Sequence, residues 1–440
     1  MEAALPAGLE IAAAWERGDE GSPEERACFA LFTIKAGNAC LTEGYDSFVN
    51  TLRAGPLVSA YHAAEWFAWN WWRLRWEPRS AAPDWAFAHR MAAIGEGYVW
   101  PNITVFSDGV RTALISNPSS RADSKPFRYV GGISIVLPST SFEGAVDAFL
   151  TQVVGRLRQE NIGETNLDRV WRDVAAERAD PAVARRRKLE ALLGRDPDEV
   201  EMETLERLLA DADSLGELAV DEIAADRAQG GALLTAEALQ ELAQRSGFDA
   251  SPRDAIRLQP GAGLPRSAET PAWRLGAAAA KFLREQENLD TAPIFDETLA
   301  RMAGTTVNVL SAPAFGPNMA FALDRNANAS RIVLRSKWKA GRRFELARLL
   351  GDRIVSPGNG RLYPATRAYT YRQKMQRSFA AELLSPFEAV DEMLAGDYST
   401  EHQQDIAEHF DVSPITIRTL LVNHGRVERE MLEEEPEAAA

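Results

Sequence analysis

Several short segments in the first 140 residues alternate apolar and polar positions, as half-buried strands do. Cys28–Lys35 has this alternation with aromatic and β-branched residues, and Ala36-Gly37-Asn38 follows it as a turn. The same reasoning predicts strands at Asn102–Phe106, Thr112–Ser116 and Gly132–Leu137. These strands indicate an N-terminal α+β domain.

Two segments of this domain have apolar residues at helical spacing, which predicts a buried helix over Pro56–Trp76 and a helix over Phe142–Gln159. Five tryptophans lie between residues 66 and 76. They could form a stacking platform for a ligand, but helical spacing favours a place in the core.

The segment 165–250 is predicted to be helical. Thr165 is a candidate N-cap, and Pro181 is expected to begin a second helix. Proline and glycine residues between Arg257 and Pro271 indicate a linker or domain entrance.

The remaining chain predicts a short sheet combined with helices. Short strands are expected at Thr306–Leu310, Met319–Leu323 and Arg331–Arg335. Helices are expected at Trp273–Glu287, Phe295–Ala303, Gly341–Ile354, Thr370–Leu384, 401–410 and 414–424. The prediction is therefore a multidomain α+β protein with an N-terminal domain (1–162), an acidic helical region (163–258), a C-terminal domain (265–430) and an acidic tail (431–440).

Composition narrows the class of protein. The chain has 440 residues, of which 45% are hydrophobic and 26% charged, as in an ordinary globular protein. It has no apolar run long enough to span a membrane, no signal-peptide pattern and only two cysteines, Cys28 and Cys40. These features predict a cytoplasmic protein with free thiols and no membrane contact.

The net charge of −15 conceals two opposite segments. Residues 331–378 contain thirteen Lys or Arg and two acids, whereas residues 196–226 contain twelve acids and one basic residue, Arg207. The acidic segment could dock on the basic one within the chain, or the basic segment could bind an external anion or protein. A solvated basic surface is the remaining interpretation.

Two motifs suggest a family. A helix containing Phe344-Glu345-Leu-Ala-Arg348 is followed by a helix containing Phe379-Ala-Ala-Glu-Leu-Leu-Ser-Pro386, and Asp405–Pro414 follows these. In motifs and element order, residues 265–430 resemble the ImmA/IrrE family of metallopeptidase domains. The resemblance implies a zincin-like fold and a bacterial regulatory setting, in stress responses, mobile elements or defence.

The residues that a zinc peptidase requires are replaced. Such a site needs two histidines at i and i+4 with a glutamate general base between them, and a third ligand from elsewhere. Phe344 and Arg348 occupy the two histidine positions, and only Glu345 remains. The third ligand is expected just before the Phe-Ala motif, where residues 373–378 contain no acid. We therefore predict a degenerate zincin-like domain with no metal and no cofactor.

The two helices instead carry cations that could bind an anion or a partner. The candidate binding residues are Arg342, Arg343, Arg348, Arg372, Gln373, Lys374 and Arg377, and Glu345 is the vestigial catalytic candidate. The predicted function is an inactive, regulatory or partner-binding protein of ImmA/IrrE type.

Two alternatives stay open. Glu345 could serve a hydrolase that lacks the usual zinc site. Residues 405–426 have a helix-turn-helix-like pattern and could belong to a DNA-binding regulator, although few cations lie near them. We expect this segment to have a packing role, because its few cations do not favour DNA binding.

Overall fold

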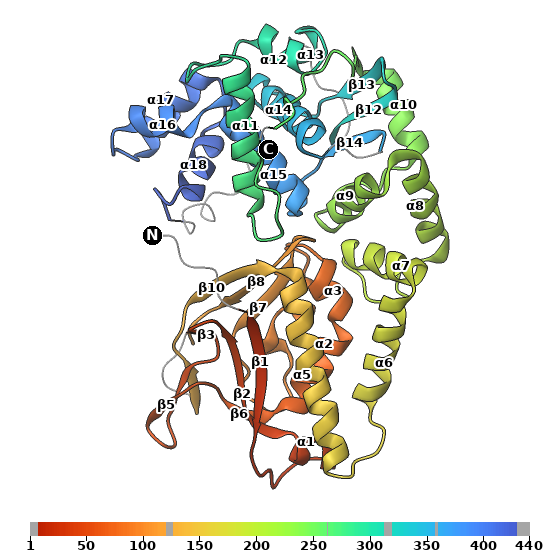
Figure 1. Ribbon diagram of the computed structural model, residues 1–440, viewed down its shortest axis with the longest axis vertical. Helices are drawn as coiled ribbons and strands as arrows, with labels where there is room; N and C mark the ends of the chain where they lie inside the picture. The colour runs from red at the N-terminus through yellow and green to blue at the C-terminus, as the bar shows by residue number, and fades with distance from the viewer. Residues whose placement is uncertain (1–7, 120–125, 262, 312–318, 357–359, 429–440) are drawn as a thin grey trace. The chain divides into compact units, whose positions relative to one another are not determined.

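The computed structural model describes residues 8–119, 126–261, 263–311, 319–356 and 360–428. The acidic tail expected over 431–440 lies outside them. The fold is mixed α+β and divides into two compact units, Met1–Leu205 and Glu206–Ala440 (Figure 1). This division falls inside the acidic helical region expected over 163–258.

The first unit contains three small antiparallel sheets and several helices. One sheet has the order β1-β2-β3 with β6 also pairing β2, and the others have the orders β10-β8-β7 and β5-β4-β9. The strands are β1 (Leu9–Trp15), β2 (Phe29–Ala36), β3 (Ala39–Cys40), β4 (Gly44–Asp46), β5 (Thr51–Arg53), β6 (Leu57–Ser59), β7 (Ile103–Ser107), β8 (Arg111–Ser116), β9 (Phe127–Tyr129) and β10 (Ile133–Pro138). The helices are α1 (Pro23–Ala27), α2 (Ala60–Trp69), α3 (Trp71–Trp76), α4 (Trp85–His89), η1 (Met91–Ala93), α5 (Ser139–Gln159), α6 (Asn166–Ala179) and α7 (Pro181–Leu192).

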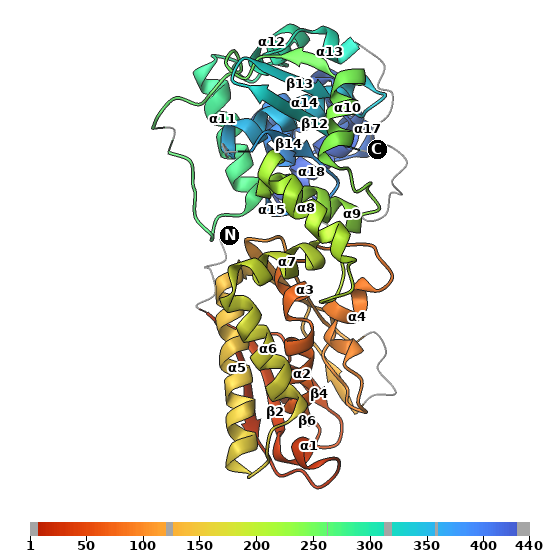
Figure 2. The same ribbon diagram turned by 90° about the vertical axis from the view of Figure 1, so that its right-hand side faces the viewer.

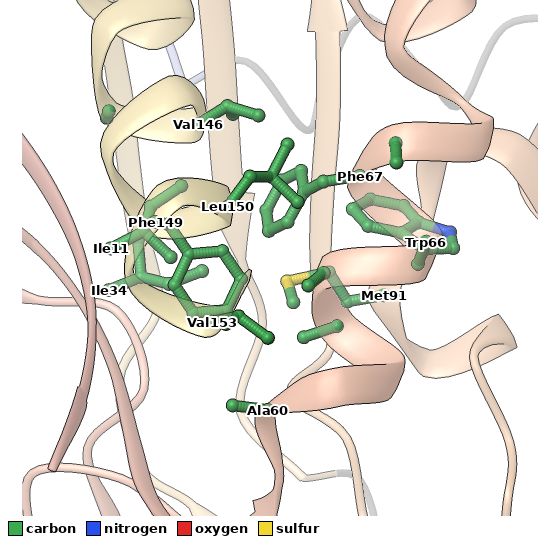
Figure 3. Packing of buried hydrophobic residues seen from close by; sticks show 14 of the residues in the cluster. Ile11, Ile34, Ala60, Trp66, Phe67, Met91, Val146, Phe149, Leu150 and Val153 are labelled. Atoms are coloured by element: carbon green, nitrogen blue, oxygen red, sulfur yellow. The ribbon is translucent and has the colours of Figure 1, made fainter. Parts of the chain in front are cut away.

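The core of this unit forms where α5 and α2 meet the first sheet. Figure 3 shows side chains of α5 lying among residues of α2, β1 and β2, including Phe149, Phe67, Ile11 and Ile34. Alternate residues of β2 are buried, which is the alternation expected for Cys28–Lys35. The strands expected within β7, β8 and β10 and the helix expected within α5 are also present.

The single helix expected over Pro56–Trp76 was wrong in its extent. Residues 57–59 form β6, and the helical part is broken at Asn70 between α2 and α3. The Asn70 side chain donates a hydrogen bond to the Trp66 carbonyl (2.8 Å), so a side-chain amide competes with the helical backbone there. Of the five tryptophans, Trp66, Trp71 and Trp72 are buried in the core, whereas Trp69 is 58% exposed.

The second unit contains one four-stranded antiparallel sheet of order β11-β13-β12-β14. Its strands are β11 (Phe248–Ala250), β12 (Ala320–Asn326), β13 (Ala329–Val333) and β14 (Leu362–Ala365). Its helices are α8 (Met202–Leu215, which begins in the first unit), α9 (Glu217–Ala228), α10 (Ala236–Ser246), α11 (Ala272–Gln286), α12 (Asp296–Met302), α13 (Asn308–Ser311), α14 (Lys339–Val355), α15 (Tyr371–Leu384), α16 (Phe387–Leu394), α17 (Thr400–Phe410) and α18 (Pro414–Asn423). None of the helices that the structure describes is long and apolar enough to cross a membrane.

Two expectations for this unit need correction. The strand expected at Thr306–Leu310 is a turn followed by the short helix α13, closed by the Val309 and Leu310 N–H groups, which donate to the carbonyls of Thr306 and Val307. The segment 165–250 was expected to be helical throughout, but Phe248–Ala250 form strand β11, which pairs with β13.

Helix α15 lies at the centre of this unit, with α11 and α14 against it. At Gly276 of α11 an added Cβ atom would lie 2.3 Å from the carbonyl oxygen of Met375 and 2.8 Å from the Phe379 nitrogen. At Gly351 of α14 it would lie 2.4 Å from the ring of Phe379. Both helices therefore approach α15 more closely than any larger residue permits.

We predict that Gly276→Ala lowers the free energy of unfolding of the second unit by about 1–3 kcal/mol, because the obstructing atoms belong to the backbone and cannot rotate away. The matched control is Gly155→Ala in α5, where no heavy atom lies within 4 Å of the added Cβ. That change should leave stability unchanged or raise it by about 0.4–1 kcal/mol. Thermal unfolding of the full chain, followed by circular dichroism, measures both, and equal melting temperatures for the two variants would contradict the close approach.

Candidate functional site

The residues of the candidate site predicted from sequence lie on α14 and α15. Five of them are buried, namely Arg342, Arg343, Glu345, Arg348 and Gln373. The structure therefore brings the predicted residues into one region, but as interior groups with partners inside the protein.

Arg348, at the second expected histidine position, is the centre of this region. Its Nη2 atom donates to the Thr366 carbonyl (2.7 Å) and to the side-chain oxygens of Gln373 (2.5 Å) and Gln376 (3.4 Å). Burial, together with the neighbouring charge of Arg377, lowers the pKa of Arg348 to about 9. A guanidinium thus joins α14, α15 and the end of β14 through oxygen acceptors.

Gln373 and Gln376 complete this arrangement. The side-chain oxygen of Gln373 also accepts from the Thr366 N–H (2.9 Å), and both side-chain amides donate to the Pro364 carbonyl, at 3.1 and 3.0 Å. Two neutral glutamines therefore link the guanidinium to the backbone of the edge strand β14.

Glu345 accepts hydrogen bonds from the first part of the segment between β13 and α14. Its Oε2 atom accepts from the backbone N–H groups of Arg335 (2.8 Å) and Ser336 (3.0 Å), and its Oε1 atom accepts from Nε of Arg335 (3.3 Å). The residue Glu345 is 6% exposed and therefore buried. Both of its oxygens are therefore engaged by the protein.

The remaining predicted cations also have internal partners. Arg342 donates to the backbone carbonyls of Leu310, Ser336 and Lys337. Arg343 forms an ion pair with Asp296 and donates to the Ile294 carbonyl. Arg377 donates to the carbonyls of Thr366 and Ala368, and burial lowers its pKa. Lys374 is partly exposed and also has a partner.

Arg372 forms a two-bond ion pair with Asp352 of α14, with donor–acceptor distances of 2.7 and 2.6 Å. Burial alone would lower the pKa of Arg372, but Asp352 reverses the effect and raises it. This pair fastens α15 to α14 one turn away from Arg348 and accounts for one of the cations expected to bind a ligand.

Helix α9, from the acidic segment, lies against the same connection (Figures 1 and 2). Glu222 accepts a hydrogen bond from the hydroxyl of Thr370 (2.7 Å), which is also the N-cap of α15. Asp226 accepts from the Arg367 N–H (2.8 Å). Residues 219–226 of α9 are buried without interruption, so the acidic segment contributes interior carboxylates as well as solvated ones.

Glu222 is the titratable group most affected by this packing. Burial raises its pKa to about 7, although Arg372 and the Thr370 hydroxyl act in the opposite direction. Glu382, inside the Phe-Ala-Ala-Glu motif, is similarly raised to a pKa of about 7 by burial. The sequence suggests the acidic segment but gives no sign that these particular carboxyls are interior.

The histidines do not gather into a site. His402 and His409 are exposed on α17, and His424 stacks on Phe387 with 3.6 Å between ring centres. His89 is buried in the first unit, where its two ring nitrogens face Glu77 and the Val105 carbonyl. Within the described ranges, no group of three or more His, Cys, Asp or Glu side chains is arranged to hold a metal ion.

Comparison of the chain with protein-family profiles, with curated proteins and with solved structures finds no match. The functional assignment therefore has to come from the residues and their geometry.

The raised pKa of Glu222 predicts a pH dependence of stability. In the folded state Glu222 holds its proton up to about pH 7, whereas in the unfolded chain it releases the proton near the ordinary glutamate pKa of 4.5. The folded state binds more protons between these values, so its stability falls as pH rises from about 4.5 to 7, by up to about 3 kcal/mol from this group. Glu222→Gln should remove that contribution and raise stability at pH 8.

Urea unfolding between pH 4.5 and 8 measures this effect in the wild type and in Glu222→Gln. The matched control is Glu206→Gln, an exposed glutamate of α8. The control should keep the wild-type slope of stability against pH. Identical slopes for all three proteins would mean that Glu222 titrates normally.

Proposed function

We propose that residues 265–430 form a catalytically inactive domain of the ImmA/IrrE kind, within a protein that regulates or binds a partner. The observation that carries this proposal is Arg348. Its buried guanidinium donates to three oxygen acceptors at the point where the helix pair would need a zinc ligand. A fixed organic cation then takes the structural role of the ion, joining two helices and a strand without an open position for water.

The other ligand positions support the same proposal. Phe344 has no donor atom for a metal, and residues 373–378 contain no acid. Glu345 accepts hydrogen bonds from two backbone N–H groups and an arginine, which occupy most of the lone pairs that a general base would offer to water. This arrangement favours a structural role for Glu345 and speaks against the hydrolase alternative.

The partner-binding part of the proposal concerns the cations that remain accessible. The buried arginines have internal partners, and α9 supplies carboxyl groups to the connection between β14 and α15. Docking of the acidic segment on the basic one is therefore our preferred role for residues 217–226. An external protein or anion at this face would contact the exposed Lys337 and Arg367. By resemblance we place this binding in the bacterial cytoplasm, in stress, mobile-element or defence regulation.

The DNA-binding alternative receives less support. Helices α17 and α18 bury Ile406, Phe410, Ile417 and Leu421 in the core of the second unit. Arg426, one of the few cations nearby, forms an ion pair with Asp391 (2.6 Å). A DNA-reading helix requires cations directed at phosphates, so packing explains this segment more simply.

Zinc content and the variant Glu345→Gln test the proposal together. The purified chain, incubated with zinc and freed of unbound ion, should contain far less than one zinc per chain by mass spectrometry. Glu345→Gln should lower stability by about 1–3 kcal/mol, because the amide loses one acceptor for the backbone N–H groups. The control Glu392→Gln, at an exposed position of α16, should leave stability within about 0.5 kcal/mol.

Stoichiometric zinc would contradict the proposal. So would peptide hydrolysis that Glu345→Gln abolishes without loss of stability, since that result would return Glu345 to a catalytic role.

A further inference from the structure

A second basic region of the C-terminal unit has the shape of a ligand cavity. Its volume is about 770 Å³, and its lining comes from residues 252–261 and 263–266, from the end of β12 and the turn after it, and from residues around the end of α14 and the start of β14. Five arginines and one acid, Asp324, line it; the arginines are Arg257, Arg266, Arg325, Arg353 and Arg361. None of these residues belongs to the site predicted from the sequence.

The single acid is already neutralised. Asp324 forms a two-bond ion pair with Arg353, with distances of 2.8 and 3.1 Å, and the Arg353 guanidinium lies 4.5 Å from the centre of the Tyr363 ring. The ion pair holds the Arg353 guanidinium over the Tyr363 ring. The charge of the other four arginines is left uncompensated by any acid that lines the cavity.

These four arginines retain most of their donor groups. Arg361 uses Nε for the Asp324 carbonyl (2.9 Å), and Arg266 uses one Nη atom for the Val355 carbonyl (3.2 Å). Among the described residues, no hydrogen bond or ion pair engages the side chains of Arg257 and Arg325, and both are exposed. Several planar donor groups are therefore available, in a protein whose net charge is −15.

A second cavity of about 500 Å³ continues from the first and shares Arg325 and Arg361 with it. It adds Arg331, which is paired with Asp249 of β11 (2.7 Å). Arg325 and Arg361 thus line both cavities, where one extended anion could contact both arginines.

Pro252, Leu258, Leu264 and Ile354 form the apolar part of the cavity lining. Arginine forks match phosphate oxygens with paired hydrogen bonds, and four available forks exceed what one carboxylate can accept. The volume lies within the range of about 300–1,000 Å³ typical of small-molecule sites.

We propose that this arginine-lined cavity binds a small molecule that carries two or more phosphate groups and has the size of a nucleoside triphosphate. The phosphates contact Arg257, Arg325 and Arg361, and the apolar part of the lining takes the rest of the ligand. This binding does not depend on whether the domain is an inactive peptidase, since the two sites share no residue.

Isothermal titration calorimetry of the full chain tests the cavity with four probes: ATP, inorganic triphosphate, inorganic pyrophosphate and orthophosphate. ATP and pyrophosphate should bind, orthophosphate should bind more weakly, and the affinities should fall as salt is raised. Arg325→Gln combined with Arg361→Gln should weaken ATP binding at least about tenfold. Arg257→Gln, which removes a side chain without internal partners, should weaken it without any effect on folding.

The matched control is Arg301→Gln on α12, an exposed arginine that does not line either cavity. It should keep the wild-type affinity. ATP carries one more phosphate than pyrophosphate, so inorganic triphosphate is the matched probe for the nucleoside part. ATP should bind more tightly than inorganic triphosphate, because contact with the apolar part of the lining adds to its affinity. An affinity for ATP no higher than that for inorganic triphosphate would contradict the place given to the nucleoside.

Three results would overturn the proposal. The wild-type chain could fail to bind ATP and pyrophosphate at millimolar concentration. Arg301→Gln could reduce affinity as much as the cavity variants do. Single-stranded DNA could bind over about a hundredfold more tightly than ATP with the same dependence on Arg325 and Arg361, which would assign the arginines to a nucleic-acid backbone.

Discussion

The close approach of α11 and α14 to α15 is the constraint on which the C-terminal unit depends. Gly276 and Gly351 allow both neighbours to contact α15 around Phe379, which is fully buried. Once α15 is fixed at this distance, its first two turns face α14 and the end of β14. Gln373 and Gln376 accept hydrogen bonds from Arg348, and Arg377 donates to the Thr366 carbonyl that Arg348 also contacts. The polar network is a consequence of the helix packing.

Packing at this distance would be unfavourable if the arginines between the helices lacked partners, since a buried charge requires compensation. The protein meets this requirement mainly with carbonyl oxygens and only partly with acids. Arg342 has three backbone acceptors, and Arg372 has Asp352. Glu222 and Asp226 of α9 supply further side-chain acceptors, for the Thr370 hydroxyl at the N-cap of α15 and for the Arg367 N–H. These contacts explain why residues of the acidic segment, about 150 positions earlier in the chain, lie in the interior of the same unit.

The sequence predicts the longer helices and several strands because their patterns are local. The alternation in β2 and the capping residue Thr165 of α6 are set by nearest neighbours, and both are found. Strand β1 is missed because its alternation uses alanines, which give little contrast between apolar and polar positions. The break at Asn70 and the pairing of β11 with β13 are missed for another reason. They depend on a side-chain amide and on a partner strand some 80 residues away.

The charge of the segment 331–378 shows why a site is harder to predict than an element. Thirteen cations within 48 residues indicate a basic surface, yet these cations lie in different environments. The cationic side chains on the inner faces of α14 and α15 donate to acceptors inside the protein, whereas Arg353 and Arg361 line a cavity. Arg257, Arg266 and several other lining residues of that cavity come from a proline- and glycine-rich stretch that composition marks only as a linker. The cavity itself requires the sheet, because the pairing of β12 with β14 brings Arg325, near the end of β12, beside Arg361.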